Sequence, residues 1–96
     1  MAEETINASA QGAVGHIVRI VGPVVDVEFA PECIPAIHNA LTVDASTHLG
    51  DIHVVLEVQL HLPGDLVRAV AMSSTDGLVR GLDVQDTGAP MKMPVG

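Results

Sequence analysis

The sequence has few aromatic, basic and cysteine residues, and each shortage narrows what the protein can be. Phe29 is the only aromatic residue among 96, so Val, Ile, Leu, Ala and Met have to fill the core. Such a core suits a small closed sheet better than a cavity for a flat ligand. Four Lys or Arg against twelve Asp or Glu give a net charge of −8. That charge disfavours a phosphate backbone, and bases would find no aromatic side chains to stack on. We therefore expect no nucleic-acid partner.

A single cysteine and the absence of long apolar runs limit the compartment and the membrane association that we expect for the chain. Cys33 cannot form a disulfide within the chain, which fits a reducing compartment, and we interpret it as a small apolar group. No run reaches the ~18 apolar residues of a transmembrane helix, so we expect no direct membrane insertion. The acidic start does not resemble a signal peptide. We predict a flexible tail over residues 1–14 and one domain over residues 15–96.

The clearest local signal is a pair of β-branched runs, Ile17 to Val21 and Val24 to Phe29. Such residues pack well on a pleated surface, so both runs are predicted strands. Gly22 and Pro23 separate them and favour a tight hairpin, because glycine accepts positive φ and proline cannot donate to a ladder.

A second strand pair follows in the middle of the chain. From Ile52 to Leu62, apolar residues recur at strict period two, which predicts a strand with one buried face. That face would carry Ile52, Val54, Leu56, Val58, Leu60 and Leu62. Pro63-Gly64-Asp65 predicts a hairpin turn, with Leu66 to Met72 as the returning strand.

The remaining segments give weaker signals. We predict a loop over residues 30–35, a single turn over 36–40, a short strand over 41–43, a turn-rich connection over 44–51, turns over 73–77 and 86–90, one helical turn over 78–81 and an edge strand over 91–95. About six short strands without a covering helix remove their edges most simply by closing. The predicted fold class is therefore all-β, a small six-stranded β-barrel with antiparallel or mixed strands.

The histidines are candidates for metal binding, but their positions have a simpler structural explanation. The five histidines, His16, His38, His48, His53 and His61, show no zinc-motif spacing. His53 and His61 would share one strand face about 26 Å apart at ~3.3 Å per residue, too far to share an ion. We interpret all five as solvated imidazoles and expect no metal site.

The carboxylates and hydroxyls also fall short of a catalytic pattern. Asp26 and Glu28 point to one strand face, and we interpret them as solvated charges. Ser73, Ser74 and Thr75 are interpreted as turn-capping residues. Arg80 lies between glycines and is available to pair with a carboxylate of the domain or of a partner. The phosphate-binding G-x-x-x-x-G-K-[ST] pattern is absent. We expect no catalytic, cofactor-binding or metal-binding residue in this chain, and no enzyme activity of its own.

Several stretches resemble the opening of the β subunit of F-type ATP synthases. They are Gly15 to Phe29, Pro35 to Leu41, Leu56 to Leu62, Val67 to Met72, Thr75-Asp-Gly-Leu-Val-Arg-Gly81, Asp86-Thr-Gly-Ala-Pro90 and Pro94-Val-Gly96. The Thr75–Gly81 string is the most specific. The sequence departs from the family pattern at Leu62 to Asp65 and at Ser74, and neither departure threatens the fold.

The resemblance implies the N-terminal six-stranded barrel of a catalytic subunit. Such barrels alternate with those of ATP synthase α subunits in a ring, in a complex peripheral to the membrane. ATP or ADP and Mg²⁺ bind in a central domain of that family, and the sequence ends at Gly96 before any such domain. The absence of an arginine-rich leader favours the cytoplasmic face of a bacterial plasma membrane.

Three other hypotheses remain open at this stage. One is a free-standing small acidic β-barrel that binds a protein or small ligand. The others are a histidine-dependent metalloenzyme and a sister subunit of another rotary ATPase.

Overall fold

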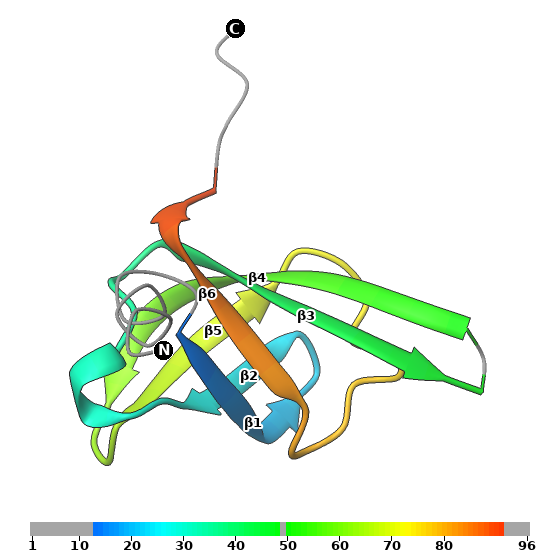
Figure 1. The fold of residues 1–96 in the computed structure, drawn as a ribbon, viewed down its shortest axis with the longest axis horizontal. Helices are drawn as coiled ribbons and strands as arrows, with labels where there is room; N and C mark the ends of the chain where they lie inside the picture. The colour runs from blue at the N-terminus through cyan, green and yellow to red at the C-terminus, as the bar shows by residue number, and fades with distance from the viewer. Residues whose placement is uncertain (1–12, 49, 92–96) are drawn as a thin grey trace, which may run out of the picture.

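Six antiparallel strands form a closed barrel in the computed structural model, which describes residues 13–48 and 50–91 (Figure 1). The strands are β1 (Val14–Val21), β2 (Val24–Glu28), β3 (Asn39–Thr47), β4 (Gly50–Leu62), β5 (Leu66–Ala71) and β6 (Asp83–Pro90), and a short 3-10 helix, η1 (Pro31–Cys33), follows β2. Around the barrel the order is β1-β2-β5-β4-β3-β6, with β6 returning to β1. The predicted six-stranded β-barrel is confirmed, and its ladders are all antiparallel.

The two predicted hairpins are present. β1 and β2 meet at the pair Val21 and Val24, on either side of the turn at Gly22, whose φ of 57° is a conformation that glycine adopts readily. β4 and β5 meet at Leu62 and Leu66 around the Pro63–Asp65 turn. Local sequence signals were sufficient for both, because a tight turn brings its own two strands into register.

The interior is filled by aliphatic side chains and one aromatic ring. The buried cluster consists of Ile17, Val25, Val27, Phe29, Leu41, Val43, Val54, Leu56, Val58, Val67, Ala69, Ala71, Leu78 and Val84. The Phe29 ring lies against Gly15: a Cβ on this glycine would lie 2.9 Å from Phe29 Cδ2 and 2.4 Å from the backbone oxygen of Glu28. Only a residue without a side chain allows β1 to approach β2 this closely.

A β-bulge changes the prediction for the end of β4. The ladder to β5 shifts between Val58 and Leu60, because Gln59 is an extra residue on the β4 side. Val54, Leu56 and Val58 are buried as predicted, whereas Leu60 is 43 % exposed. The prediction that Leu60 lies on the buried face is wrong, because the extra residue in the bulge reverses which face of the strand Leu60 points to.

Two segments predicted as connections are strands. Residues 44–47 continue β3 and residues 50–51 begin β4, where Asp44 pairs with His53 and Ser46 pairs with Asp51; only His48 between them is a described turn residue. Residues 86–90 belong to β6, although Gly88 has a φ of 80° and the ladder to β3 is irregular there. Cross-strand pairing decides both cases against their turn-forming composition.

Smaller predictions had mixed outcomes. The predicted strand over 41–43 is the middle of the longer β3, and the turn over 36–40 occupies only residues 37 and 38. Leu78 to Gly81 form no helix: one turn occurs at residues 80 and 81, with the Leu82 N–H donating to the Val79 carbonyl at 3.4 Å. The edge strand predicted over 91–95 does not begin at Met91, and its other residues lie outside the described residues, as do residues 1–12 of the predicted tail.

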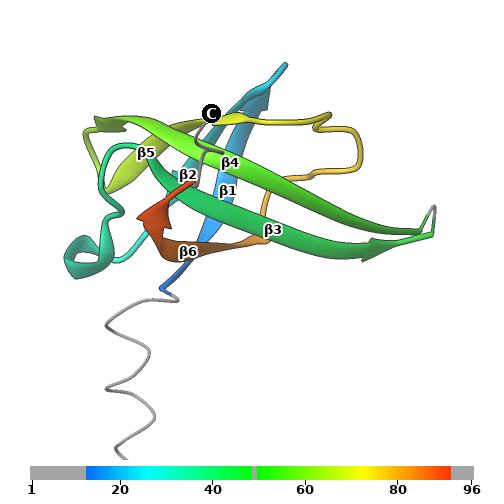
Figure 2. The same ribbon diagram turned by 90° about the horizontal axis from the view of Figure 1, so that it is seen from above.

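The hairpin of β3 and β4 projects from one side of the barrel, well beyond the other strands (Figure 2). At its opposite end β3 carries a buried polar contact: Asn39 Nδ2 donates to Asp86 Oδ1 at 3.2 Å, and the Gly88 N–H donates to the same oxygen at 2.9 Å. Within the described residues, no helix has the length and apolar character needed to cross a bilayer.

Candidate functional site

The candidate site is the outer wall formed by β1, β2, β5 and β4, where outward-facing residues align across the strands. Arg19 of β1 pairs with Asp26 of β2. Asp26 also pairs with Arg68 of β5, and Arg68 pairs in turn with Leu60 of β4. We call these four residues the arginine row. Two charges of one sign thus flank a charge of the other sign on a single line around the barrel.

Two bulges place this row on the outside. In β1 the ladder shifts between Ile17 and Arg19, so Val18 is an extra residue. In a regular strand Arg19, two residues after the buried Ile17, would point into the core with it. The β4 bulge turns Leu60 outward in the same way. Neither Arg19 nor Arg68 was predicted from the sequence as a site residue. The available signal was a lone arginine inside an apolar strand, a position that needs either a bulge or a buried partner.

Asp26 has such a partner. Arg68 Nε donates to Asp26 Oδ1 at 2.9 Å, and Arg68 Nη2 donates to Oδ2 at 3.1 Å, a bidentate pair. The Asp26 side chain is 6 % exposed and that of Arg68 is 39 % exposed. The hydrogen bond to Asp26, and then its charge, raise the pKa of Arg68 above the ordinary arginine value. The prediction that Asp26 is a solvated charge is therefore wrong, because Arg68 covers it.

Apolar side chains surround the row. Val21, Val24 and Val70 form the adjacent register line, with Val21 54 % exposed. A hollow opens among Arg19, Val21, Val24, Asp26 and Arg68. An outward face of an antiparallel barrel is commonly polar, so one exposed and two half-buried valines beside an arginine are suited to contact with another molecule.

On the other side of the row lies a half-exposed pair. His16 Nε2 and Glu28 Oε1 are 3.1 Å apart. Asp26 and Glu28 do share the outer face of β2, as predicted, but each carboxylate is engaged with a different side chain. The arrangement holds charges in place across strands and does not present two free carboxylates to a common substrate.

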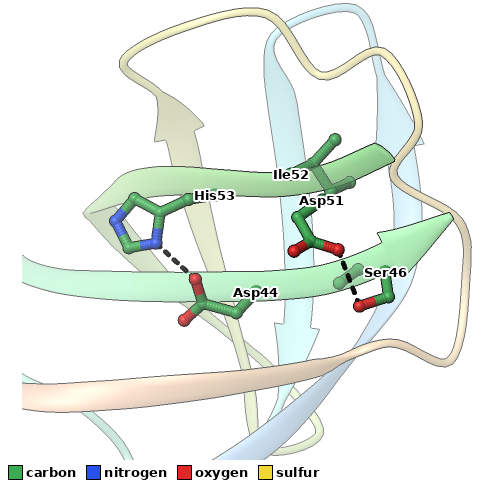
Figure 3. A pocket seen from close by; sticks show the side chains of 6 residues that line it. Asp44, Ser46, Asp51, Ile52 and His53 are labelled. Carbon is green, nitrogen blue, oxygen red and sulfur yellow. Dashed lines mark hydrogen bonds and ion pairs between the residues drawn. The ribbon is translucent and has the colours of Figure 1, made fainter. Parts of the chain in front are cut away.

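A second depression lies on the projecting hairpin (Figure 3), lined by Asp44, Ala45, Ser46, Asp51, Ile52 and His53. Asp44 Oδ1 and His53 Nδ1 lie 2.5 Å apart, and the Ser46 hydroxyl donates to Asp51 Oδ1 at 2.9 Å. Both contacts run from β3 to β4, so they hold the hairpin strands together. The side chains of Asp44 and His53 are mostly exposed to solvent, and the depression is shallow surface rather than an enclosed site.

The five histidines have different surroundings. His16 pairs with Glu28 and His53 with Asp44, while His61 Nε2 contacts the Pro35 carbonyl at 2.7 Å. His38 and His48 are exposed. The expectation that His53 and His61 share a strand face is wrong, since the β4 bulge lies between them. Across residues 13–48 and 50–91, no three His, Cys, Asp or Glu side chains are grouped to hold a metal ion.

The loop between β5 and β6 is organised by hydroxyl groups. The Asp76 N–H donates to Ser74 Oγ at 3.0 Å, and the Thr75 hydroxyl donates to the Gly22 carbonyl at 3.0 Å. The first contact confirms the turn-capping interpretation for Ser74. The interpretation is wrong for Thr75, because its hydroxyl bonds the β1–β2 turn, 53 positions away, rather than the backbone of its own turn. Arg80 is exposed and makes no ion pair within the part of the chain that the structure describes.

Comparison with known proteins agrees with this architecture. Residues 17–88 match a family model described as the ATP synthase alpha/beta family, beta-barrel domain. The matched span runs from the middle of β1 into β6, so it includes β2 to β5 entirely, part of β1 and β6, both bulges and the whole arginine row.

Proposed function

Because this chain belongs to the ATP synthase alpha/beta family, we propose that it is the N-terminal barrel of a catalytic β subunit. The observation that carries the proposal is the match over residues 17–88, joined to the β-subunit-like string Thr75-Asp-Gly-Leu-Val-Arg-Gly81. In this proposal the barrel does no chemistry. Its role is to hold the subunit beside its neighbours in the α/β ring of a synthase that makes or hydrolyses ATP with proton transport.

The two sides of the barrel support such a role, because they differ. The wall of β1, β2, β5 and β4 presents the arginine row and exposed valine. On the wall of β3 and β6, outward Thr42 pairs with Gln85, which also pairs with Val14. A ring of alternating subunits needs two different contact surfaces on each member, whereas an isologous dimer uses one surface twice. A closed barrel also has no free sheet edge, so its neighbours meet side chains rather than unpaired backbone.

The proposal assigns no cofactor to this barrel. ATP, ADP and Mg²⁺ belong to the nucleotide-binding domain that the family resemblance implies further along a β subunit. The partners are α subunits, and the place is the cytoplasmic face of a bacterial plasma membrane, as a peripheral part of the synthase. We accordingly expect the 96-residue chain to neither bind nor hydrolyse ATP.

Two experiments test the proposal. Sequencing the gene beyond Gly96 should reach a Gly-x-x-x-x-Gly-Lys-Thr segment in the same frame. Co-expression of the resulting full chain with α subunits, followed by native mass spectrometry, should give a complex with equal numbers of both subunits. A native stop codon after Gly96 together with no α binding would instead favour the free-standing acidic barrel. ATP hydrolysis by the homogeneous 96-residue chain would contradict the purely structural role.

A further inference from the structure

We propose that the hollow at Arg19 is the docking point of the barrel, and that it receives a carboxylate side chain, flanked by aliphatic residues, from the neighbouring non-identical subunit. This inference rests on the proposed function and deepens it by naming the wall and the chemistry of the contact. Three steps lead to it: the state of the arginines, the apolar side chains around them, and the charge of the whole chain.

The first step is that one of the two arginines is already satisfied and the other is not. Arg68 directs Nε and Nη2 onto both carboxylate oxygens of Asp26. Arg19 faces Asp26 from β1, on the side away from Arg68. Arg19 is exposed and has no hydrogen bond or ion pair within the described ranges. The hollow is thus lined by two cations and one anion, which leaves one positive charge without a partner.

The second step concerns the frame around that charge. Val21 and Val24 line the same hollow, and Leu60 ends the row with its side chain 43 % exposed. Apolar surroundings that lose water on contact strengthen a hydrogen-bonded charge pair at their centre. The guanidinium also matches carboxylate geometry with two parallel donors. The surface therefore fits an Asp or Glu side chain with aliphatic neighbours.

The third step excludes a second copy of this chain as the occupant. Each copy carries a net charge of −8, so two copies repel each other at long range. Only four Lys or Arg occur in the sequence, and two of them are in this row. Half of the positively charged residues of this acidic chain therefore lie at one hollow. This concentration of charge favours binding of a different protein that presents a carboxylate.

The test compares charge variants of Arg19 in the full β chain by their affinity for the α subunit. Arg19→Gln and Arg19→Glu should weaken binding by at least about tenfold, with Glu the weaker binder, while Arg19→Lys should fall between wild type and Gln. The weakening should be larger at low salt, since salt screens the lost attraction. Circular dichroism spectra should not change, because Arg19 is exposed.

His48→Glu is the matched control, since it lowers the net charge by one unit, as Arg19→Gln does, at the exposed end of the β3–β4 hairpin. It should leave the affinity unchanged. Replacing the acidic residues of the α barrel by Lys, one at a time, should identify one position that restores binding to Arg19→Glu.

The outcomes separate the two proposals. If wild type binds no α subunit, the proposed function fails, and the docking assignment is overturned with it. If wild type binds and the Arg19 variants bind equally well, only the docking assignment is overturned. An equal loss in His48→Glu would also overturn it, since net charge would then be the cause. Self-association that Arg19→Glu abolishes would assign the hollow to a second copy and refute the proposal.

Discussion

Gly15→Ala tests the closest backbone approach in the barrel. An alanine Cβ would lie 2.4 Å from the Glu28 backbone oxygen and 2.9 and 3.0 Å from two carbons of the Phe29 ring. Ordinary contacts lie near 3.5 Å, so the oxygen would have to retreat by roughly 1 Å. The ring can rotate, but the Glu28 oxygen belongs to the strand that pairs with β1. The strands must therefore separate where His16 faces Glu28.

Overpacking of this kind costs about 1–3 kcal/mol. For a domain of this size, about 2 kcal/mol lowers the thermal midpoint by roughly 8–16 °C. Thermal unfolding followed by far-ultraviolet circular dichroism measures the shift. Val14→Ala, one residue away and exposed, is the control and should change stability by less than about 0.5 kcal/mol.

A second variant shows which atom causes the cost. Phe29→Leu removes the ring carbons but leaves the Glu28 oxygen in place. In that background Gly15→Ala should still cost about 1 kcal/mol or more. A Gly15→Ala protein as stable as wild type would refute the reasoning. If the cost disappeared completely in the Phe29→Leu background, the ring rather than the backbone would be the obstacle.

Three further predictions concern the β4 bulge, the Asp26–Arg68 pair and the pH dependence of that pair. In urea unfolding, Leu56→Ala should lower the free energy of unfolding by about 2–5 kcal/mol, because this side chain is fully buried. Leu60→Ala, beyond the bulge of the same strand, should lower it by less than about 0.5 kcal/mol. Equal losses for the two variants would refute the outward position of Leu60. Asp26→Asn should destabilise the chain by about 1–3 kcal/mol in the same assay, because a buried acceptor loses its charge-assisted bonds. The pKa of Arg68 is raised, so the stability that it contributes is present below the ordinary arginine pKa and is lost only as pH rises through the raised value. The difference between wild type and Asp26→Asn should accordingly stay constant from about pH 7 to about pH 10, and a decrease over that range would contradict the raised pKa.

The sequence predicted those parts of the fold that depend on near neighbours. The hairpins at Gly22 and at Pro63–Asp65 each join two alternating apolar runs, and both form. The barrel class followed from the number of short strands and the lack of a covering helix. Residues 44–47 and 50–51 were misassigned because their strand character comes from pairs across the hairpin, such as Ser46 with Asp51.

The candidate site was less accessible to sequence reasoning. The position of Arg19 depends on an extra residue in β1, and that of Leu60 on an extra residue in β4. A period-two pattern contains no mark of either bulge. Asp26 was read as solvated because its partner Arg68 lies 42 positions away, and only the register of β2 with β5 brings the two together. Long-range pairing, rather than residue type, creates this surface.

The order of strands around the barrel also bears on how the protein is made. A ribosome delivers β1 first and β6 last, yet these two strands pair with each other to close the barrel. β2 likewise waits for β5, which emerges only after the long β3–β4 hairpin. Until then the first hairpin carries open edges and an uncovered apolar face, the features that favour aggregation during synthesis. A pause in translation before Leu66, the first residue of β5, would prolong this stage and increase the chance of mispairing.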